Sequence, residues 1–203
     1  MKKISSLVLA LCIVLSISAV ALAEISGDAV VPCKVPFMIT NAGQGPGGKM
    51  GNLLVSRAGT LVDQEDYFYV DVPYAADVDE RPYGAIVIVI GSTDKGLGAT
   101  GITIDEEIAR VNEVMARANE TNVPVIAVLL EKDKRSTSPT NANERCIDAV
   151  CPLASWMIVV TDANTDGRFD KIKEEYGVPL TILDNSMDFI SVIQQAFAKE
   201  TAE

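Results

Sequence analysis

Apolar residues along this chain recur in short runs separated by segments of mixed polarity. Three runs are continuous and rich in β-branched side chains: 85–90 (AIVIVI), 123–130 (VPVIAVLL) and 156–160 (WMIVV). Strands covered by helices on both faces have this composition. Residues 67–72 (YFYVDV) alternate two sets of side chains and stop at Pro73, as an edge strand does. With shorter runs at 35–40 (VPFMIT) and 179–183 (PLTIL), the pattern predicts about six strands.

Between these runs the apolar residues change to helical spacing. They recur at intervals of four, three and four at Ile104, Ile108, Val111 and Met115. Thr103 and Glu106 form a capping box at the start of this segment. Further helices are predicted at about 49–58, in 141–154, from 169 to 176 and from 189 to 197.

Alternating strands and helices predict an α/β fold with one doubly wound parallel sheet, flavodoxin-like or Rossmann-like. The continuous runs belong inside the sheet, and 67–72 and 179–183 belong at its edges. With strands numbered along the chain, this favours the order 2-1-3-4-5-6 over 3-2-1-4-5-6. We expect an extended lead-in over residues 24–34 and a single domain over residues 35–203.

The first segment, residues 1–23, reads as a secretory signal peptide. Two lysines precede an apolar run that ends in Ala21-Leu22-Ala23, an A-x-A cleavage signal. The run is too short and ends in residues too small for a retained membrane anchor. We therefore expect an exported protein, periplasmic or extracellular, that does not contact the membrane after cleavage.

Charge and composition exclude several functional classes. The chain has 17 basic and 28 acidic residues and a net charge of −11, so it lacks the excess of cations that nucleic acids require. A hydrophobic content of 48% is enough for a packed core. There is no histidine, which removes the commonest general base, histidine-based catalytic triads and most zinc sites.

Three cysteines follow the predicted signal peptide: Cys33, Cys146 and Cys151. The odd number leaves at least one free or paired between chains. Cys146 and Cys151 are too far apart on one helix to form a disulfide unless Pro152 breaks the last turn. Small buried side chains explain them better than a nucleophile, because no histidine is present to activate a thiol.

The stretch 43–50 (GQGPGGKM) has the G-x-x-x-x-G-K spacing of a phosphate-binding P-loop. Met50 stands where that motif requires serine or threonine, whose hydroxyl holds magnesium, and a thioether cannot replace it. Nucleoside triphosphates are also scarce outside the cytoplasm. We do not expect a nucleotide hydrolase.

The two most glycine-rich loops, 40–49 and 91–103, follow the first and third predicted strands. Ligands of doubly wound sheets bind where the strand order reverses, which is between these strands. Together with cations in the loop 131–143, the two loops predict a site for a small polar or anionic ligand. The predicted ligand-binding residues are Asn41, Gly43, Gln44, Lys49, Ser92, Thr93, Lys95, Gly96, Gly98 and Thr100. The alternative is that the glycines only permit tight turns and the lysines are solvated.

Three short blocks carry a resemblance to a known family: NAGQ (41–44), KGLGATGI (95–102) and NTDG-x-F (164–169). In this combination the chain resembles an uncharacterised family, a domain of unknown function, of exported bacterial α/β proteins. The resemblance runs from about residue 35 to the C-terminus. It implies an α/β fold and export, and it brings no activity with it.

Residues 162–170 (DANTDGRFD) match the first part of an EF-hand calcium loop. Asp162, Asn164 and Asp166 are therefore candidate calcium ligands. Lys173 stands at the twelfth position, where a bidentate glutamate belongs, and a strand precedes the loop. A polar turn in which aspartate or threonine caps the next helix is the alternative.

Two functions of different classes remain open. We favour a non-enzymatic, exported protein that binds a small polar or anionic ligand at the carboxyl-terminal edge of the sheet. The alternative is an extracytoplasmic enzyme without histidine, built on the same loops, with lysine, aspartate or glutamate as acid and base. Lys95 with Asp94 is one such pair. No cofactor is predicted other than calcium.

Overall fold

A computed structural model describes residues 25–199 of the protein. The predicted signal peptide, residues 1–23, lies outside the described residues. Within them, no helix is long and apolar enough to cross a membrane.

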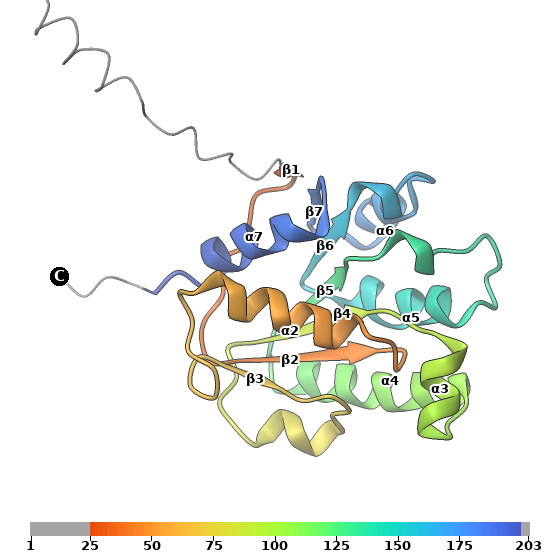
Figure 1. Cartoon of the computed structure of the whole chain (residues 1–203), viewed down its shortest axis with the longest axis horizontal. Helices are drawn as coiled ribbons and strands as arrows, with labels where there is room; N and C mark the ends of the chain where they lie inside the picture. Colours follow the sequence, from red (N-terminus) through yellow and green to blue (C-terminus); the bar gives the residue numbers. More distant parts are fainter. Residues whose placement is uncertain (1–24, 200–203) are drawn as a thin grey trace, which may run out of the picture.

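One seven-stranded sheet runs through the middle of the molecule, in the order β1-β7-β6-β5-β4-β2-β3 (Figure 1). Its strands are β1 (Ile25–Gly27), β2 (Phe37–Ala42), β3 (Tyr67–Tyr69), β4 (Ala85–Ile90), β5 (Val125–Leu129), β6 (Trp156–Val160) and β7 (Leu180–Leu183). Strands β2 to β7 pair in parallel, whereas β1 pairs antiparallel with β7. The predicted α/β class is confirmed, but the sheet is mixed and not purely parallel.

The strand count and the full order differ from the prediction because residues 25–27 form an edge strand and not an extended lead-in. Ile25 pairs with Leu183, and the N–H of Asp28 donates to the carbonyl of Leu180 at 2.8 Å. Strand β7, predicted at an edge, therefore has a neighbour on each side. The six parallel strands follow one another as β3-β2-β4-β5-β6-β7.

Six α-helices lie within the described residues: α2 (Gly47–Ala58), α3 (Asp94–Thr100), α4 (Ile104–Glu120), α5 (Ala142–Val150), α6 (Arg168–Tyr176) and α7 (Phe189–Ala196). Helix α2 connects β2 to β3, and α4, after α3, connects β4 to β5. These two connections run in opposite directions along the sheet. Because parallel crossovers are right-handed, these two helices cover opposite faces. Helix α2 packs with α7 on one face, and α4 packs with α5 on the other (Figure 1).

The core follows the apolar runs of the sequence. Every residue of β2, β4, β5 and β6 is buried, as expected for strands covered by helices on both faces. The rings of Phe37 and Phe197 stack with centroids 3.9 Å apart, which ties the end of α7 to β2. The indole of Trp156 donates to Thr181 Oγ1 at 2.9 Å, so its buried N–H has a partner.

The whole of residues 91–103 was expected to be a loop. In the structure, this segment contains the short helix α3. Thr93 caps this helix by accepting a hydrogen bond from the N–H of Gly96 at 2.9 Å. Gly101, in the left-handed conformation, ends it. The capping box of Thr103 and Glu106 then starts α4 as predicted.

Candidate functional site

The structure brings the two glycine-rich loops together at the carboxyl-terminal edge, where β2 and β4 are neighbours. Gln44 and Ser92 form an isolated antiparallel bridge between the loops. The convergence expected from the strand order is therefore present.

The loops pack against each other so closely that glycine is required. A Cβ added at Gly45 would lie 2.1 Å from the carbonyl oxygen of Gly91, and one at Gly96 would lie 1.9 Å from that of Gln44. A Cβ added at Gly43, whose φ is +108°, would lie 2.5 Å from Ser92 Cβ. These glycines serve contact between the loops and do not form an open cradle for a ligand.

The protein's own Glu107, from α4, occupies the donors predicted to face a ligand. Its Oε1 accepts from the N–H of Gly43 at 2.7 Å, and its Oε2 accepts from Gln44 Nε2 at 2.9 Å. Arg110 donates to both oxygens, and the two side chains are 0% and 7% exposed. Arg110 also donates to the carbonyl of Pro73 at 2.7 Å. This hydrogen bond connects the ion pair to the segment that follows β3. An internal ion pair fills the place predicted for the anion.

The remaining predicted residues have structural contacts or lie exposed. Asn41 Nδ2 donates to the carbonyl of Asp71 at 2.6 Å, and Lys49 forms an exposed ion pair with Asp71 at 3.6 Å. Thr100 Oγ1 bonds to carbonyls of its own helix. Gly98 and Lys95 are exposed on α3, as is Asp94, the partner suggested for Lys95 in the enzyme alternative.

Three buried polar atoms mark the carboxyl ends of β4 and β5. Ser92 Oγ, Glu131 Oε2 and Asn143 Nδ2 make no hydrogen bond to any other described residue. The Asn143 side chain is oriented by its Oδ1, which accepts from the N–H of Ser92 at 3.0 Å. Buried polar groups without a partner cost free energy, and a bound water, an ion or a functional role explains those that native proteins retain.

The β5–β7 cleft, as we name it, is a hollow of about 200 Å³ at this same edge, beyond the ends of β5, β6 and β7. It is lined by Leu130, Lys132, Val160, Asp162, Asp184, Asn185 and Ser186. Lys132 Nζ donates to Asp162 Oδ2 at 2.9 Å, and this hydrogen bond raises the pKa of the Lys132 ammonium. Within the described residues, the side chain of Asp184 makes no hydrogen bond and no ion pair. The cleft therefore combines an ion-paired ammonium with a carboxylate that has no partner among the described residues.

Sequence reasoning noted the lysines after β5 but missed Asp184 and Ser186. These residues directly follow the last predicted strand, 179–183. Because parallel strands end at one edge, the position of that strand was a usable signal.

A second hollow, about 200 Å³, adjoins the loop where calcium was predicted. Here Asp162 pairs with Lys132, and Asp166 pairs with Arg135 at 2.8 Å. Asn164 Oδ1 accepts from the N–H of Phe169 at 2.9 Å, so asparagine holds the turn before α6. In residues 25–199 no group of three or more His, Cys, Asp or Glu side chains is placed to hold a metal. Calcium binding at Asp162, Asn164 and Asp166 stays a prediction.

The cysteines offer no nucleophile. Cys33, Cys146 and Cys151 are free thiols. Burial raises the pKa of Cys33 to about 11 and that of Cys146 to about 12, so both stay protonated near neutral pH.

Gly96→Ala and Gly98→Ala form a matched pair within α3. We expect the first to lower the free energy of unfolding by about 1–3 kcal/mol, because its Cβ would overlap the Gln44 carbonyl. At Gly98 an added Cβ meets nothing within 4 Å, so alanine should raise stability by about 0.5–1 kcal/mol. Urea denaturation of both variants measures the difference. Equal effects would contradict the close contact between the loops.

Comparison with known proteins gives a family and, among the solved structures, matches of low similarity that include two esterases. A family described as a domain of unknown function, DUF6305, matches residues 34–197. No curated protein matches the chain in sequence. The psychrotrophic esterase EstA from Pseudoalteromonas sp. is 10% identical, with a TM-score of 0.32 over 72% of this chain and 76% of that one. AlinE4, an SGNH-hydrolase family esterase, is 10% identical, with a TM-score of 0.29 over 88% and 87%.

The prediction of a non-enzymatic binding protein is corrected. The physical reason lies in the glycine loops, where Glu107 takes the donors that the ligand was expected to use.

Proposed function

We propose that this chain, which belongs to the DUF6305 family, is an enzyme that hydrolyses a small polar ester in the β5–β7 cleft without histidine. One observation carries the proposal: the free carboxylate of Asp184 lines the same cleft as the Lys132–Asp162 ion pair. A carboxylate base and a positive charge that face one open cavity are two of the groups that ester hydrolysis uses.

The reaction follows from these groups. Asp184 accepts a proton from a water molecule as that water attacks the ester carbonyl carbon. The carbonyl oxygen gains negative charge, which the Lys132 ammonium stabilises, while Asp162 holds that ammonium in place. The intermediate then expels the alkoxide, which takes the proton from Asp184 and leaves as alcohol beside the carboxylic acid. Ser186, on the cleft wall, is placed to hydrogen-bond the substrate.

Export is part of the proposal. It is supported by the two lysines, the apolar run and the A-x-A signal within residues 1–23. An enzyme acting outside the cytoplasm has no supply of nucleotide cofactors, and the chemistry above needs only water and side chains.

A panel of chromogenic substrates tests the proposal, with p-nitrophenyl acetate and butyrate set against p-nitrophenyl phosphate and glucoside. We expect hydrolysis of the carboxylic esters and a loss of about ten- to a hundredfold in kcat/KM for Lys132→Gln. The loss is smaller than for a buried oxyanion donor because water screens an exposed ammonium. Lys134→Gln is the control, since Lys134 lies on the same loop but does not line the cleft.

Two results would overturn the proposal. The first is a protein that cleaves none of the carboxylic esters above the buffer rate. The second is an equal loss of activity in the Lys132 and Lys134 variants, which would place the reaction elsewhere.

A further inference from the structure

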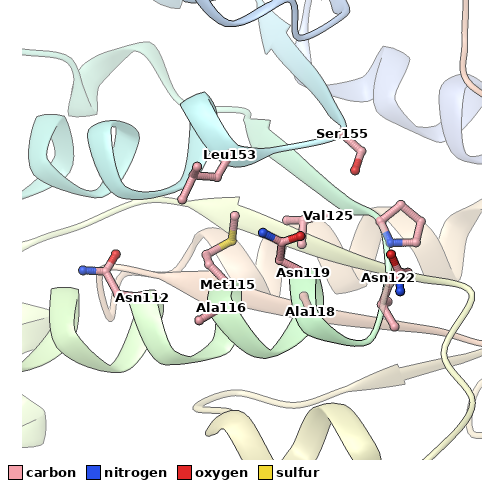
Figure 2. Close-up of a pocket in the computed structure, with 11 residues that line it drawn as sticks. Asn112, Met115, Ala116, Ala118, Asn119, Asn122, Val125, Leu153 and Ser155 are labelled. Atoms are coloured by element: carbon pink, nitrogen blue, oxygen red, sulfur yellow. The ribbon is translucent and has the colours of Figure 1, made fainter.

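A hollow of about 520 Å³ lies at the opposite end of the sheet from the β5–β7 cleft. We call it the α4 groove. One wall is formed by the second half of α4, and the other by the start of β5 and the segment carrying Leu153 and Ser155 (Figure 2). In Figure 2, Met115 and Asn119 project from α4 toward that segment. The volume is in the usual range for a small-molecule site.

The lining of the α4 groove is uncharged in a strongly charged chain. It consists of Asn112, Met115, Ala116, Ala118, Asn119, Asn122, Val123, Pro124, Val125, Leu153 and Ser155. The charged residues of this part of α4 lie outside it, and Arg117 is turned toward Asp79 at 2.9 Å. An ionic ligand would therefore find no counter-charge in the groove.

Three side-chain amides give the groove its polarity. Asn112 and Asn119 are seven residues apart, two turns of α4, so they share one face of the helix. Asn122 follows just beyond the helix end, in the left-handed conformation at φ 57°. Within residues 25–199 no hydrogen bond joins any of these three amides to another protein group. They are exposed and free to bind a ligand.

The remaining lining is aliphatic. Leu153 is 67% exposed on the rim, and the buried Met115 and Val125 form the floor. An amide both donates and accepts hydrogen bonds, as a sugar hydroxyl does, and aliphatic side chains pack against the C–H face of a sugar ring. This combination, without any charge, fits a neutral polyhydroxylated ligand.

We propose that the α4 groove binds an uncharged saccharide of two or three rings. The site lies at the amino-terminal edge of the sheet and does not depend on the β5–β7 cleft or on its activity. Binding relies on the amides of Asn112 and Asn119, with Leu153 packing against a ring face.

NMR titration of the ¹⁵N-labelled protein with maltotriose, cellotriose and N-acetylated chitotriose tests the proposal. We expect at least one of these to shift amide resonances of α4 around Asn112 and Asn119. Trigalacturonic acid, which has three rings and adds negative charge, should bind more weakly. Asn112→Ala and Asn119→Ala should each weaken binding by about two- to tenfold, the loss expected for one neutral hydrogen bond.

Glu113→Gln is the matched control, because Glu113 is exposed on α4 but does not line the groove. It should leave saccharide affinity unchanged. Thermal melts of the two asparagine variants separate lost binding from lost folding, since both side chains are exposed on α4 and alanine, a better helix former, should not lower the melting temperature. The proposal is overturned if none of the three saccharides shifts groove resonances, or if the control weakens binding as much as the asparagine variants.

Discussion

Replacing Arg110 by methionine is expected to lower the free energy of unfolding by about 3–5 kcal/mol, the usual cost of removing one partner of a buried ion pair. The change would leave Glu107, which is 0% exposed, without the guanidinium that contacts both of its oxygens. It would also remove the donors to the carbonyls of Pro73 and Asn41. Urea denaturation followed by circular dichroism measures the loss.

Arg117→Met is the control for this prediction. Arg117 lies on the same helix and pairs with Asp79 and Glu120, but its side chain is 37% exposed. An ion pair in contact with water contributes little, so we expect a loss below about 1 kcal/mol. If the two variants lose equal stability, burial does not raise the contribution of the Glu107–Arg110 pair above that of an exposed pair.

Asp184→Asn is expected to lower kcat/KM for ester hydrolysis by about 10²–10⁴-fold, the contribution of a general base. The substitution keeps the size of the side chain and removes its ability to take a proton from water. Because Asp184 is exposed and makes no ion pair or side-chain hydrogen bond within residues 25–199, the melting temperature should not change. Initial rates on the best carboxylic ester, together with thermal melts, measure both effects.

Asp133→Asn provides the comparison for the Asp184 variant. Asp133 is an exposed aspartate that follows Lys132 but does not line the cleft. The activity of the Asp133→Asn variant should therefore equal that of the wild type. Full activity in Asp184→Asn would remove this carboxylate from the mechanism, whatever the Lys132 variant shows.

The layered fold could be predicted from local patterns, because each buried strand needs its own apolar run. AIVIVI at 85–90 is β4, with every residue buried. Strand β1 could not be predicted in this way, since its three residues, ISG, carry too little pattern. Its position depends on Asp28 and β7, which lie about 150 residues apart in the chain.

The sequence predicted a site at the carboxyl-terminal edge over β2 and β4, whereas the β5–β7 cleft opens at the same edge over other strands. Glycine spacing cannot distinguish a loop that cradles a ligand from a loop that packs against another loop. The difference depends on Glu107, which is 64 residues from Gly43. A signal was nevertheless present, because Glu107 and Arg110 continue the buried stripe of Val111 and Val114 at helical spacing. Charged residues on a core face indicate an internal ion pair.

Strand β1 also protects the molecule from edge-to-edge aggregation. Without it, Leu180–Leu183 would present an unpaired row of N–H and C=O groups to any other chain in an extended conformation. Strand β1 is only three residues long, and so is β3 at the opposite edge. Neither edge strand therefore offers a long template for intermolecular pairing. The Asp28 carboxylate accepts from the N–H of Leu180 and pairs with Lys173, which keeps this short protective strand in place.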